Sequence, residues 1–388
     1  MTSALGRAAV SLGRDPSADA AVDQRFMCEA LALGHRNFGR TWPNPSVGAI
    51  VVRETEVGPV VVARGITQPG GRPHAETQAL TAAGAAARGA TLYVTLEPCS
   101  HHGKTPPCCD AVVAAGIKRV VGALEDANPQ VAGEGYRRIR AAGIAVESGV
   151  LAREALRAHR GHILRVTRGR PCVTLKLART PDGFAARSRG PRLLVTSEAA
   201  NARVHLTRLH ADAILVGVGT VLADDPQLTV RLPGLERRSP VRVVFDSGLR
   251  TPPTARLVAT ARDVPTWIVT GVDAPRGREA PLSAAGVEVL RVAADPSGRL
   301  NLPAALMLLA SRGLTRVFCE GGPALGDALA KADLVDEVVL ITGPTPLGEA
   351  GLPALGPALA TLLADAKRMA QWETFAADGD IFALYERA

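Results

Sequence analysis

Residues 95–111 read TLEPCSHHGKTPPCCDA, and a second motif upstream, at residues 73–76, reads PHAE. The apolar run that ends at Leu96 predicts a strand, and a helix is expected to begin near Cys108. His74, Cys99 and Cys108 offer one imidazole and two thiolates, the ligands that zinc prefers. Three protein ligands leave a fourth tetrahedral position for water, and bound zinc lowers the pKa of that water towards about 7. The two motifs therefore predict a catalytic zinc site.

Glu76 follows His74 by two residues, so it can lie beside that water without binding the metal and can carry its proton. The order H-x-E, then P-C, then another cysteine is typical of zinc-dependent base deaminases, in which hydroxide adds to a ring carbon and ammonia leaves. A structural zinc or a set of buried thiols is the alternative. A structural site more often uses four ligands and does not need Glu76.

Spacing alone leaves the third zinc ligand open. In base deaminases the second cysteine usually follows P-C after two residues, where this chain has His102. The next thiols are Cys108 and Cys109. A thiolate at Cys108 would be stabilised by the dipole of the helix expected to start there.

Composition narrows the class of protein. At roughly 100–200 residues per domain, 388 residues suggest two or three domains. Hydrophobic residues make up 47% and charged residues 21%, which excludes a wholly disordered or collagen-like chain. The 7 Phe, 3 Trp and 3 Tyr are too few for broad platforms that stack single-stranded nucleic acid. The net charge of +8 comes without a Lys/Arg block, which favours anionic small molecules as ligands over nucleic acid.

The sequence suggests a cytoplasmic protein. Its longest uncharged run, residues 350–364, is interrupted by glycines and prolines and is shorter than the roughly 18–20 residues of a membrane span. The first 21 residues lack an apolar segment with a cleavage site, so we expect a flexible leader and not a secretory signal. Six cysteines in such a chain favour thiols or metal ligands over disulfides.

Helical and strand patterns alternate along the chain. Over residues 22–168 they predict an α/β/α layered domain, which opens with a helix over Asp23–Gly39 and ends with a basic helix over Ala152–Arg168. A second α/β domain follows over residues 169–388, with a strand at Val173–Leu177 and a last predicted strand at Glu337–Thr342. No internal repeat relates the two halves, so we expect two different catalytic units.

The second domain contains two glycine turns next to apolar strands, at residues 218–226 and 320–326. Such turns expose backbone N–H groups at a helix start, where an anion such as a dinucleotide phosphate can bind. The G-x-G-x-x-G spacing of a Rossmann fold is absent.

The two motifs above, together with PNPSVG at residues 43–48, resemble the bifunctional riboflavin-biosynthesis deaminase/reductase family, and the resemblance covers about residues 22–388. It implies a cytidine-deaminase-like α/β/α domain joined to a dihydrofolate-reductase-like α/β domain, with Zn²⁺ and NADPH as cofactors. The implied first reaction removes the 2-amino group of 2,5-diamino-6-ribosylamino-4(3H)-pyrimidinone 5′-phosphate. The second reduces the ribosyl group of 5-amino-6-(5-phosphoribosylamino)uracil to ribityl with NADPH.

The resemblance also implies a role for individual residues. In the deaminase, His74, Cys99 and Cys108 would bind zinc and Glu76 would carry the proton. The deaminase substrate would contact Asn44, Lys104, Asp126 and Asn128. The reductase cofactor would contact Ala178, Leu194, Thr220, Asp224, Ser247 and Gly322. The reductase substrate would contact Lys176, Arg192, Arg208, Leu228, Arg231 and Glu320.

The chain departs from the family pattern at a few points. Arg192 and Leu194 stand where the family often has Ser and Trp, and Thr67 stands where a His is common. The implied partner is a phosphorylated pyrimidine, with no nucleic acid or membrane, and the family suggests a homo-oligomer, a dimer or larger. Two alternatives are a nucleic-acid base deaminase with an accessory domain and a noncatalytic nucleotide-binding protein with a structural zinc.

Overall fold

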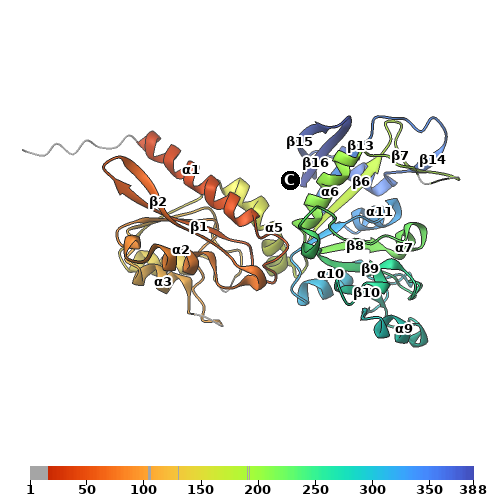
Figure 1. The fold of residues 1–388 in the computed structure, drawn as a ribbon, viewed down its shortest axis with the longest axis horizontal. Coiled ribbons are helices and arrows are strands. Elements are labelled where there is room, and N and C mark those ends of the chain that lie inside the picture. Colours follow the sequence, from red (N-terminus) through yellow and green to blue (C-terminus); the bar gives the residue numbers. More distant parts are fainter. Residues whose placement is uncertain (1–15, 104–105, 130, 190, 192) are drawn as a thin grey trace, which may run out of the picture.

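The computed structural model describes residues 16–103, 106–129, 131–189, 191 and 193–388. Lys104 and Arg192, two of the predicted substrate residues, lie outside the described residues. Figure 1 shows two bodies side by side, the first from red to yellow and the second from green to blue, with helix α5 between them.

The first body is built on a five-stranded sheet of order β2-β1-β3-β4-β5. The pairs β1–β2 and β1–β3 are antiparallel, whereas β3–β4 and β4–β5 are parallel. The strands are β1 (Gly48–Thr55), β2 (Gly58–Ile66), β3 (Thr91–Val94), β4 (Arg119–Gly122) and β5 (Ala145–Ser148). The helices are α1 (Pro16–His35), α2 (Ala75–Ala83), α3 (Cys108–Ala114), α4 (Glu134–Ala141) and α5 (Ala152–Arg168), with short 3₁₀ turns at Pro69–Gly71 and Gly84–Ala87.

Alternating residues of β1 divide the core of this body into two layers. Ala49 and Val51 pack with α2, α3 and α4 on one face of the sheet. Ile50 and Val52 pack with α1 and α5 on the other. This alternation follows from the two-residue period of a strand, and it produces the α/β/α layering expected from the sequence.

The second body contains a nine-stranded sheet of order β11-β10-β9-β8-β12-β6-β13-β16-β15. All neighbours from β11 to β13 are parallel, and the last two pairs are antiparallel. The strands are β6 (Cys172–Arg179), β8 (Ala213–Gly217), β9 (Val241–Phe245), β10 (Thr266–Gly271), β11 (Glu288–Val292), β12 (Arg316–Cys319), β13 (Glu337–Thr342), β15 (Met369–Ala377) and β16 (Asp380–Arg387). A separate ribbon joins β7 (Phe184–Arg187) to β14 (Gly351–Pro353).

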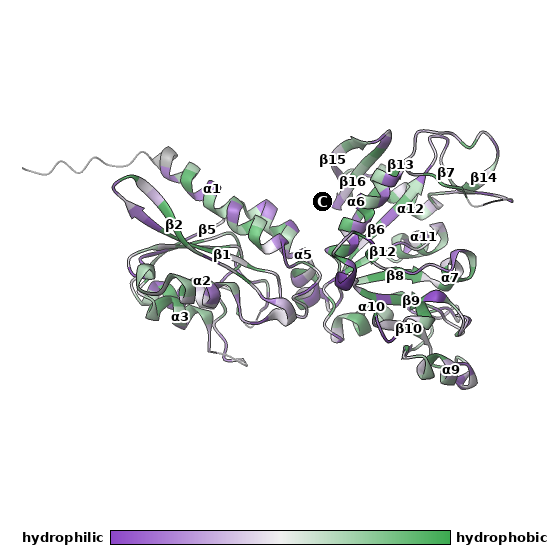
Figure 2. Cartoon of the chain, viewed as in Figure 1, coloured by the Kyte–Doolittle hydropathy of each residue, from purple (hydrophilic) through white to green (hydrophobic). Residues whose placement is uncertain are grey.

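Helices surround this larger sheet, and its central strands β8 and β9 are almost wholly buried. Figure 2 shows these strands mostly in the green of hydrophobic residues. Near-continuous apolar strands are typical of a parallel sheet covered on both faces. The helices are α6 (Glu198–Leu209), α7 (Val218–Asp224), α8 (Arg256–Ala259), α9 (Glu279–Ala284), α10 (Leu302–Ser311), α11 (Pro323–Lys331) and α12 (Pro357–Ala364), with 3₁₀ turns at Glu236–Arg238 and Arg276–Arg278.

The structure differs from the sequence-based expectations at both ends of the chain. The first helix begins at Pro16, so residues 16–21 belong to α1 and not to a leader. A proline in the first turn and Asp19 close behind it favour a helix start there. At the other end, β15 and β16 extend the sheet beyond the last predicted strand. Among the described helices, none has the length and apolar character needed to cross a bilayer.

Candidate metal centre and reductase site

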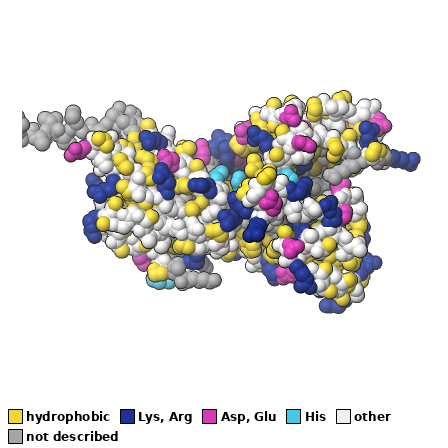
Figure 3. Space-filling model, viewed as in Figure 1, with side chains coloured by type: hydrophobic (Ala, Val, Ile, Leu, Met, Phe, Trp, Pro, Cys, Tyr) yellow, Lys and Arg dark blue, Asp and Glu magenta, His cyan; other side chains and the backbone are white. Residues whose placement is uncertain are grey.

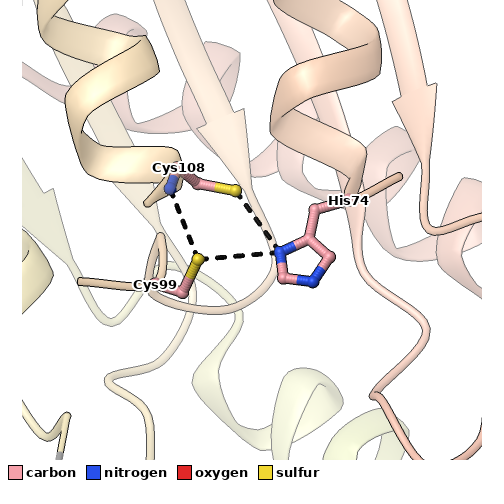
Figure 4. A group of neighbouring side chains, drawn as sticks. All are labelled: His74, Cys99 and Cys108. Atoms are coloured by element: carbon pink, nitrogen blue, oxygen red, sulfur yellow. Dashed lines mark hydrogen bonds between the residues drawn. The ribbon is translucent and has the colours of Figure 1, made fainter. Parts of the chain in front are cut away.

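Three side chains from separate elements meet at one point of the first body (Figure 4). His74 precedes α2, Cys99 lies on the loop after β3, and Cys108 is the first residue of α3. Their ligand atoms all lie within 4.8 Å of one another. His74 Nδ1 lies 3.6 Å from Cys99 Sγ and 3.4 Å from Cys108 Sγ. Tetrahedral zinc with ordinary Zn–N and Zn–S bonds requires separations of about 3.6 Å, so this donor set fits zinc.

The two neighbouring cysteines of α3 point in different directions. Cys108 faces His74, and its backbone N–H donates to Cys99 Sγ at 3.3 Å. Cys109 is packed in the hydrophobic cluster between α2 and the sheet, and its thiol donates to Asp110. His102, which occupies the usual position of the second cysteine, is exposed. The geometry therefore favours Cys108 among the candidates that spacing left open.

Glu76 lies in the first turn of α2 with only 3% of its surface exposed. Burial raises the pKa of Glu76 to about 7. A hydrogen bond between the two thiols lowers the pKa of Cys99 and raises that of Cys108. Because zinc binds thiolates, metal binding displaces the proton that Cys108 holds, whereas Cys99 is already a thiolate at neutral pH.

Asp126 and Asn128 lie on the loop between β4 and α4, and two residues that sequence reasoning missed hold that loop. Asp126 Oδ1 accepts from the Asn128 backbone N–H at 2.9 Å and lies 3.0 Å from His162 Nε2. Glu97, just before Pro98 and Cys99, accepts backbone N–H groups from Asp126, Gly133, Gly135 and Tyr136. One buried carboxylate thus ties the zinc loop to the predicted substrate loop.

Asn44 lies on the loop that precedes β1 and contacts the short 3₁₀ turn at Pro69–Gly71. Its side-chain amide donates to the Gly71 carbonyl at 2.8 Å, and a side chain at Gly71 would collide with it. Asn44 also lines a small cavity of about 20 Å³, together with His159 and His162. Since His162 contacts Asp126, the fold brings Asn44 and the Asp126 loop to neighbouring positions.

The predicted reductase residues gather at the carboxyl edge of the parallel strands, where ligands bind in open α/β sheets. Lys176 and Ala178 lie towards the end of β6, and Thr220 and Asp224 lie on α7, directly after β8. Ser247 follows β9, while Glu320 and Gly322 follow β12 and lead into α11. Leu194 is 82% exposed and lines a cavity of about 330 Å³, together with Thr180 and Ser197.

Arg208 and Glu320 form a buried pair in this second site. Arg208 Nε lies 2.5 Å and Nη2 lies 2.9 Å from the two Glu320 oxygens, and Nη1 donates to the Thr229 carbonyl at 2.8 Å. Burial by itself raises the pKa of Glu320, but the charge and hydrogen bond of Arg208 outweigh it, so the pKa is lowered. Each of the three guanidinium nitrogens of Arg208 therefore makes a hydrogen bond to another group of the protein.

Arg231 and Leu228 lie on the segment after α7. Leu228 is buried with a φ of 52°, and Arg231 is exposed. The backbone N–H of Arg231 donates to His205 Nδ1 at 3.2 Å. Burial, followed by the charges of Arg208 and Arg231, lowers the pKa of His205 to about 4. Sequence reasoning missed His205, although it lies three residues before Arg208 and so on the same face of α6.

The chain matches two family models. Residues 20–124 match the zinc-binding region of cytidine and deoxycytidylate deaminases, and residues 171–377 match the RibD C-terminal domain. The riboflavin biosynthesis protein RibD of Escherichia coli K12 is 42% identical over 339 residues, covering 84% of this chain and 89% of that relative. The chain belongs to the RibD family of riboflavin biosynthesis proteins.

Solved RibD structures agree with this assignment over nearly the whole chain. One of Acinetobacter baumannii RibD superposes with a TM-score of 0.81 at 32% identity, covering 95% of this chain and all of that one. Another, a diaminohydroxyphosphoribosylaminopyrimidine deaminase/5-amino-6-(5-phosphoribosylamino)uracil reductase from Thermotoga maritima, has a TM-score of 0.79 at 33% identity, covering 95% and 100% of the two chains.

Membership of the RibD family confirms the predicted fold class and the predicted kind of enzyme. The chain is a bifunctional deaminase and reductase of riboflavin biosynthesis, hence both a hydrolase and an oxidoreductase. Its deaminase domain binds zinc and its reductase domain uses NADPH.

Proposed function

We propose that this chain deaminates 2,5-diamino-6-ribosylamino-4(3H)-pyrimidinone 5′-phosphate and then reduces the ribosyl group of 5-amino-6-(5-phosphoribosylamino)uracil to ribityl. The name of the Thermotoga maritima relative supports both steps. The observation that carries the proposal is the buried Glu76 beside the His74, Cys99 and Cys108 cluster. Zinc, when bound there, activates water at near-neutral pH.

In the deaminase site, we assign metal binding to His74, Cys99 and Cys108. Glu76 takes a proton from the attacking water and gives it to the departing ammonia, a role that suits a buried carboxyl group beside the zinc ligands. Asn44, Asp126 and Asn128 orient the substrate, and Lys104 is proposed to contact its phosphate. Water adds to the ring carbon that carries the amino group, the C–N bond breaks and ammonia leaves.

In the reductase site, we propose that Ala178, Leu194, Thr220, Asp224, Ser247 and Gly322 contact NADPH. Lys176, Arg192, Leu228, Arg231 and Glu320 hold the substrate. The contacts of Arg208 with Glu320 and Thr229 support a different task for Arg208 from the substrate contact that the family resemblance implied. We assign it the positioning of Glu320, which leaves the exposed Arg231 as the better candidate for the phosphate.

We also propose a cytoplasmic, homo-oligomeric enzyme with a domain boundary near Gly169. All six cysteines are free thiols, which supports a reducing compartment. Gly169 follows the last residue of α5 with a φ of 65° and ends that helix. Lys and Arg side chains are spread over both bodies on the face drawn in Figure 3, an arrangement that suits separate sites for small anions.

Glu76→Gln tests the deaminase assignment. The amide keeps the shape of Glu76 but cannot accept the proton, so we expect retained zinc and a fall of at least about 100-fold in ammonia release. The experiment measures zinc content and ammonia on the purified full-length enzyme. NADPH oxidation with the pre-deaminated nucleotide reports on the reductase and should stay at the wild-type level.

The control is Glu56→Gln, a change at an exposed glutamate of the β1–β2 turn in the same domain. It should leave both activities unchanged. Wild-type ammonia release by Glu76→Gln would contradict the assignment of Glu76. Ammonia released by the wild-type enzyme from single-stranded DNA or transfer RNA, and not from the nucleotide, would contradict the proposed substrate.

A further inference from the structure

Helix α5 places two histidines one turn apart against the deaminase domain. His162 Nε2 lies 3.0 Å from Asp126 Oδ1, and the two side chains are only 11% and 13% exposed. His159 is almost fully buried, and its Nε2 lies 3.1 Å from Thr95 Oγ1. None of the motifs in the sequence pointed to either histidine.

The hydrogen bond between His162 and Asp126 has a defined donor and a defined acceptor. Burial by itself raises the pKa of Asp126, but the hydrogen bond from His162 outweighs burial, and the pKa of Asp126 is lowered. Asp126 is therefore ionised at neutral pH and can only accept hydrogen bonds. Nε2 of His162 must carry the proton that it shares with Asp126.

The Asp126 carboxylate is held from one side. Its two hydrogen bonds to described residues, from His162 and from the Asn128 backbone, both fall on Oδ1. The Asp126 backbone N–H is fixed separately by Glu97 at 2.9 Å. Neither of these two hydrogen bonds engages Oδ2, so Oδ2 is the oxygen that they leave for a ligand.

The other ring nitrogens of the two histidines are buried, and both rings border a small cavity. Nδ1 of His159 and Nδ1 of His162 are buried without a partner among the described residues. Both rings line the small cavity of about 20 Å³, with Thr41, Ser46 and Thr315. A cavity of that size holds one water, and the polar lining supplies the partners that such a water needs.

We propose that His162 is a positioning residue for the deaminase reaction, which fixes the Asp126 carboxylate so that Oδ2 meets the substrate. The inference rests on the proposed function, because it gives Asp126 a substrate contact. His162 acts through Asp126 and does not touch the reacting atoms. Because α5 also leads into the reductase domain, the helix between the domains completes the deaminase substrate loop.

Three substitutions at His162 test this. His162→Phe keeps a planar ring but removes the donor, and His162→Asn keeps an amide that is too short to reach Asp126. His162→Gln retains a donor at about the position of Nε2. We expect His162→Phe and His162→Asn to raise the KM for deamination about tenfold or more, because each loses the hydrogen bond to the charged Asp126. The kcat should change less than about threefold, and Gln should restore most of the wild-type KM.

A double-mutant cycle separates positioning from general damage. If His162 acts through Asp126, then adding His162→Phe to Asp126→Asn should raise KM no further than Asp126→Asn alone. Zinc content and NADPH oxidation with the pre-deaminated nucleotide should match the wild type in every variant. Leu156→Ala, an exposed change on the same helix, is the control.

A wild-type KM in both His162→Phe and His162→Asn would overturn the proposal, as would additive effects in the cycle or a failure of Gln to restore KM. If His162→Phe alone loses reductase activity, that variant is damaged more generally, and the KM values of His162→Asn and His162→Gln decide the test. These outcomes differ from a failure of the proposed function itself, in which the wild-type enzyme would release no ammonia from the nucleotide.

Discussion

At the scale of single residues, the clearest distinction is between Cys108 and Cys109. Successive residues of a helix point about 100° apart, so two adjacent cysteines at a helix start cannot both face the same point. Cys108 faces His74, and Cys109 packs in the core. Sequence motifs alone named the pair as candidates, but the direction of each side chain depends on where α3 begins.

Two matched substitutions test this assignment. Cys108→Ser should lose most of the bound zinc and the ammonia release, because a hydroxyl is a much poorer zinc ligand than a thiolate. Cys109→Ala should keep about one zinc per chain and lose only about 1 kcal/mol of stability from the small cavity. Metal analysis of the two purified proteins provides the comparison. Zinc loss from Cys109→Ala with retention in Cys108→Ser would reverse the assignment.

Other residue roles could not be predicted because they depend on contacts between distant parts of the chain. Glu97 was visible within the motif at residues 95–111, but its four N–H donors come from residues 126–136. Arg208 was expected from the family resemblance to contact the substrate, and its partner Glu320 lies 112 residues further along. A sequence shows which groups are present, whereas the fold decides which of them remain available to a ligand.

At the scale of elements, helices and strands with a regular apolar period were predicted well, whereas those without one were missed. The basic helix predicted over Ala152–Arg168 has those bounds, because its apolar residues recur at helical spacing. The strands β15 and β16 were not predicted. Most of β15 is exposed or half-buried at the sheet edge, so it lacks the apolar run that marks a buried strand. Helix α7 was missed because it directly follows β8 without a turn.

The packing of α2 on β2 positions two of the catalytic groups and provides a test at this scale. A Cβ at Gly65 would lie 2.0 Å from the Ala75 carbonyl oxygen and 2.6 Å from the Ala79 nitrogen. Gly65→Ala should therefore push the start of α2, with His74 and Glu76, away from the sheet. We expect weaker zinc binding and a loss of ammonia release, with NADPH oxidation unchanged. Zinc titration and the two activity assays measure this.

The control is Gly277→Ala, which lies in a 3₁₀ turn where a Cβ would meet nothing within 4 Å. It should preserve both activities and the zinc content. Unchanged zinc affinity in Gly65→Ala would show that the close contact between α2 and β2 does not hold the metal site in place.

At the scale of the whole molecule, α5 and the final strand β16 join the two domains. Arg157 donates two hydrogen bonds to Glu386, at 2.8 Å and 2.7 Å, and Arg160 donates a third at 3.1 Å. The guanidinium of Arg157 also lies over the Trp372 ring. The two strands that sequence reasoning missed thus supply Glu386 and Trp372 to the contact between the domains, and Glu337 of β13 adds a second carboxylate near Arg160.

This ion cluster predicts a loss of stability in acid. Burial by itself raises the pKa of Glu386, but Arg157 and Arg160 outweigh it, and the pKa is lowered. A carboxyl with a lowered folded-state pKa stabilises the fold above its unfolded pKa of about 4.3 and loses that effect as pH falls through the folded-state pKa. Glu386→Gln should lower the unfolding midpoint by a few degrees at pH 7, and this difference should disappear in acid.

Thermal unfolding of the wild type and of Glu386→Gln at a series of pH values measures this. Glu373→Gln, at an exposed position of β15, is the control and should follow the wild type. If the unfolding midpoints of the wild type and Glu386→Gln differ as much in acid as at pH 7, then the charge of Glu386 does not stabilise the contact between the domains.

The most direct test of the two-site account is the mass of the product that the full-length enzyme makes from the diaminopyrimidine nucleotide, with and without NADPH. Without NADPH, we predict ammonia release and a product in which an oxygen replaces the ring amino group. With NADPH, the same product should gain two further hydrogens, and removal of zinc should abolish the first change while the pre-deaminated nucleotide is still reduced. A product that gains two hydrogens but keeps the amino group, or deamination that survives complete zinc removal, would contradict the account.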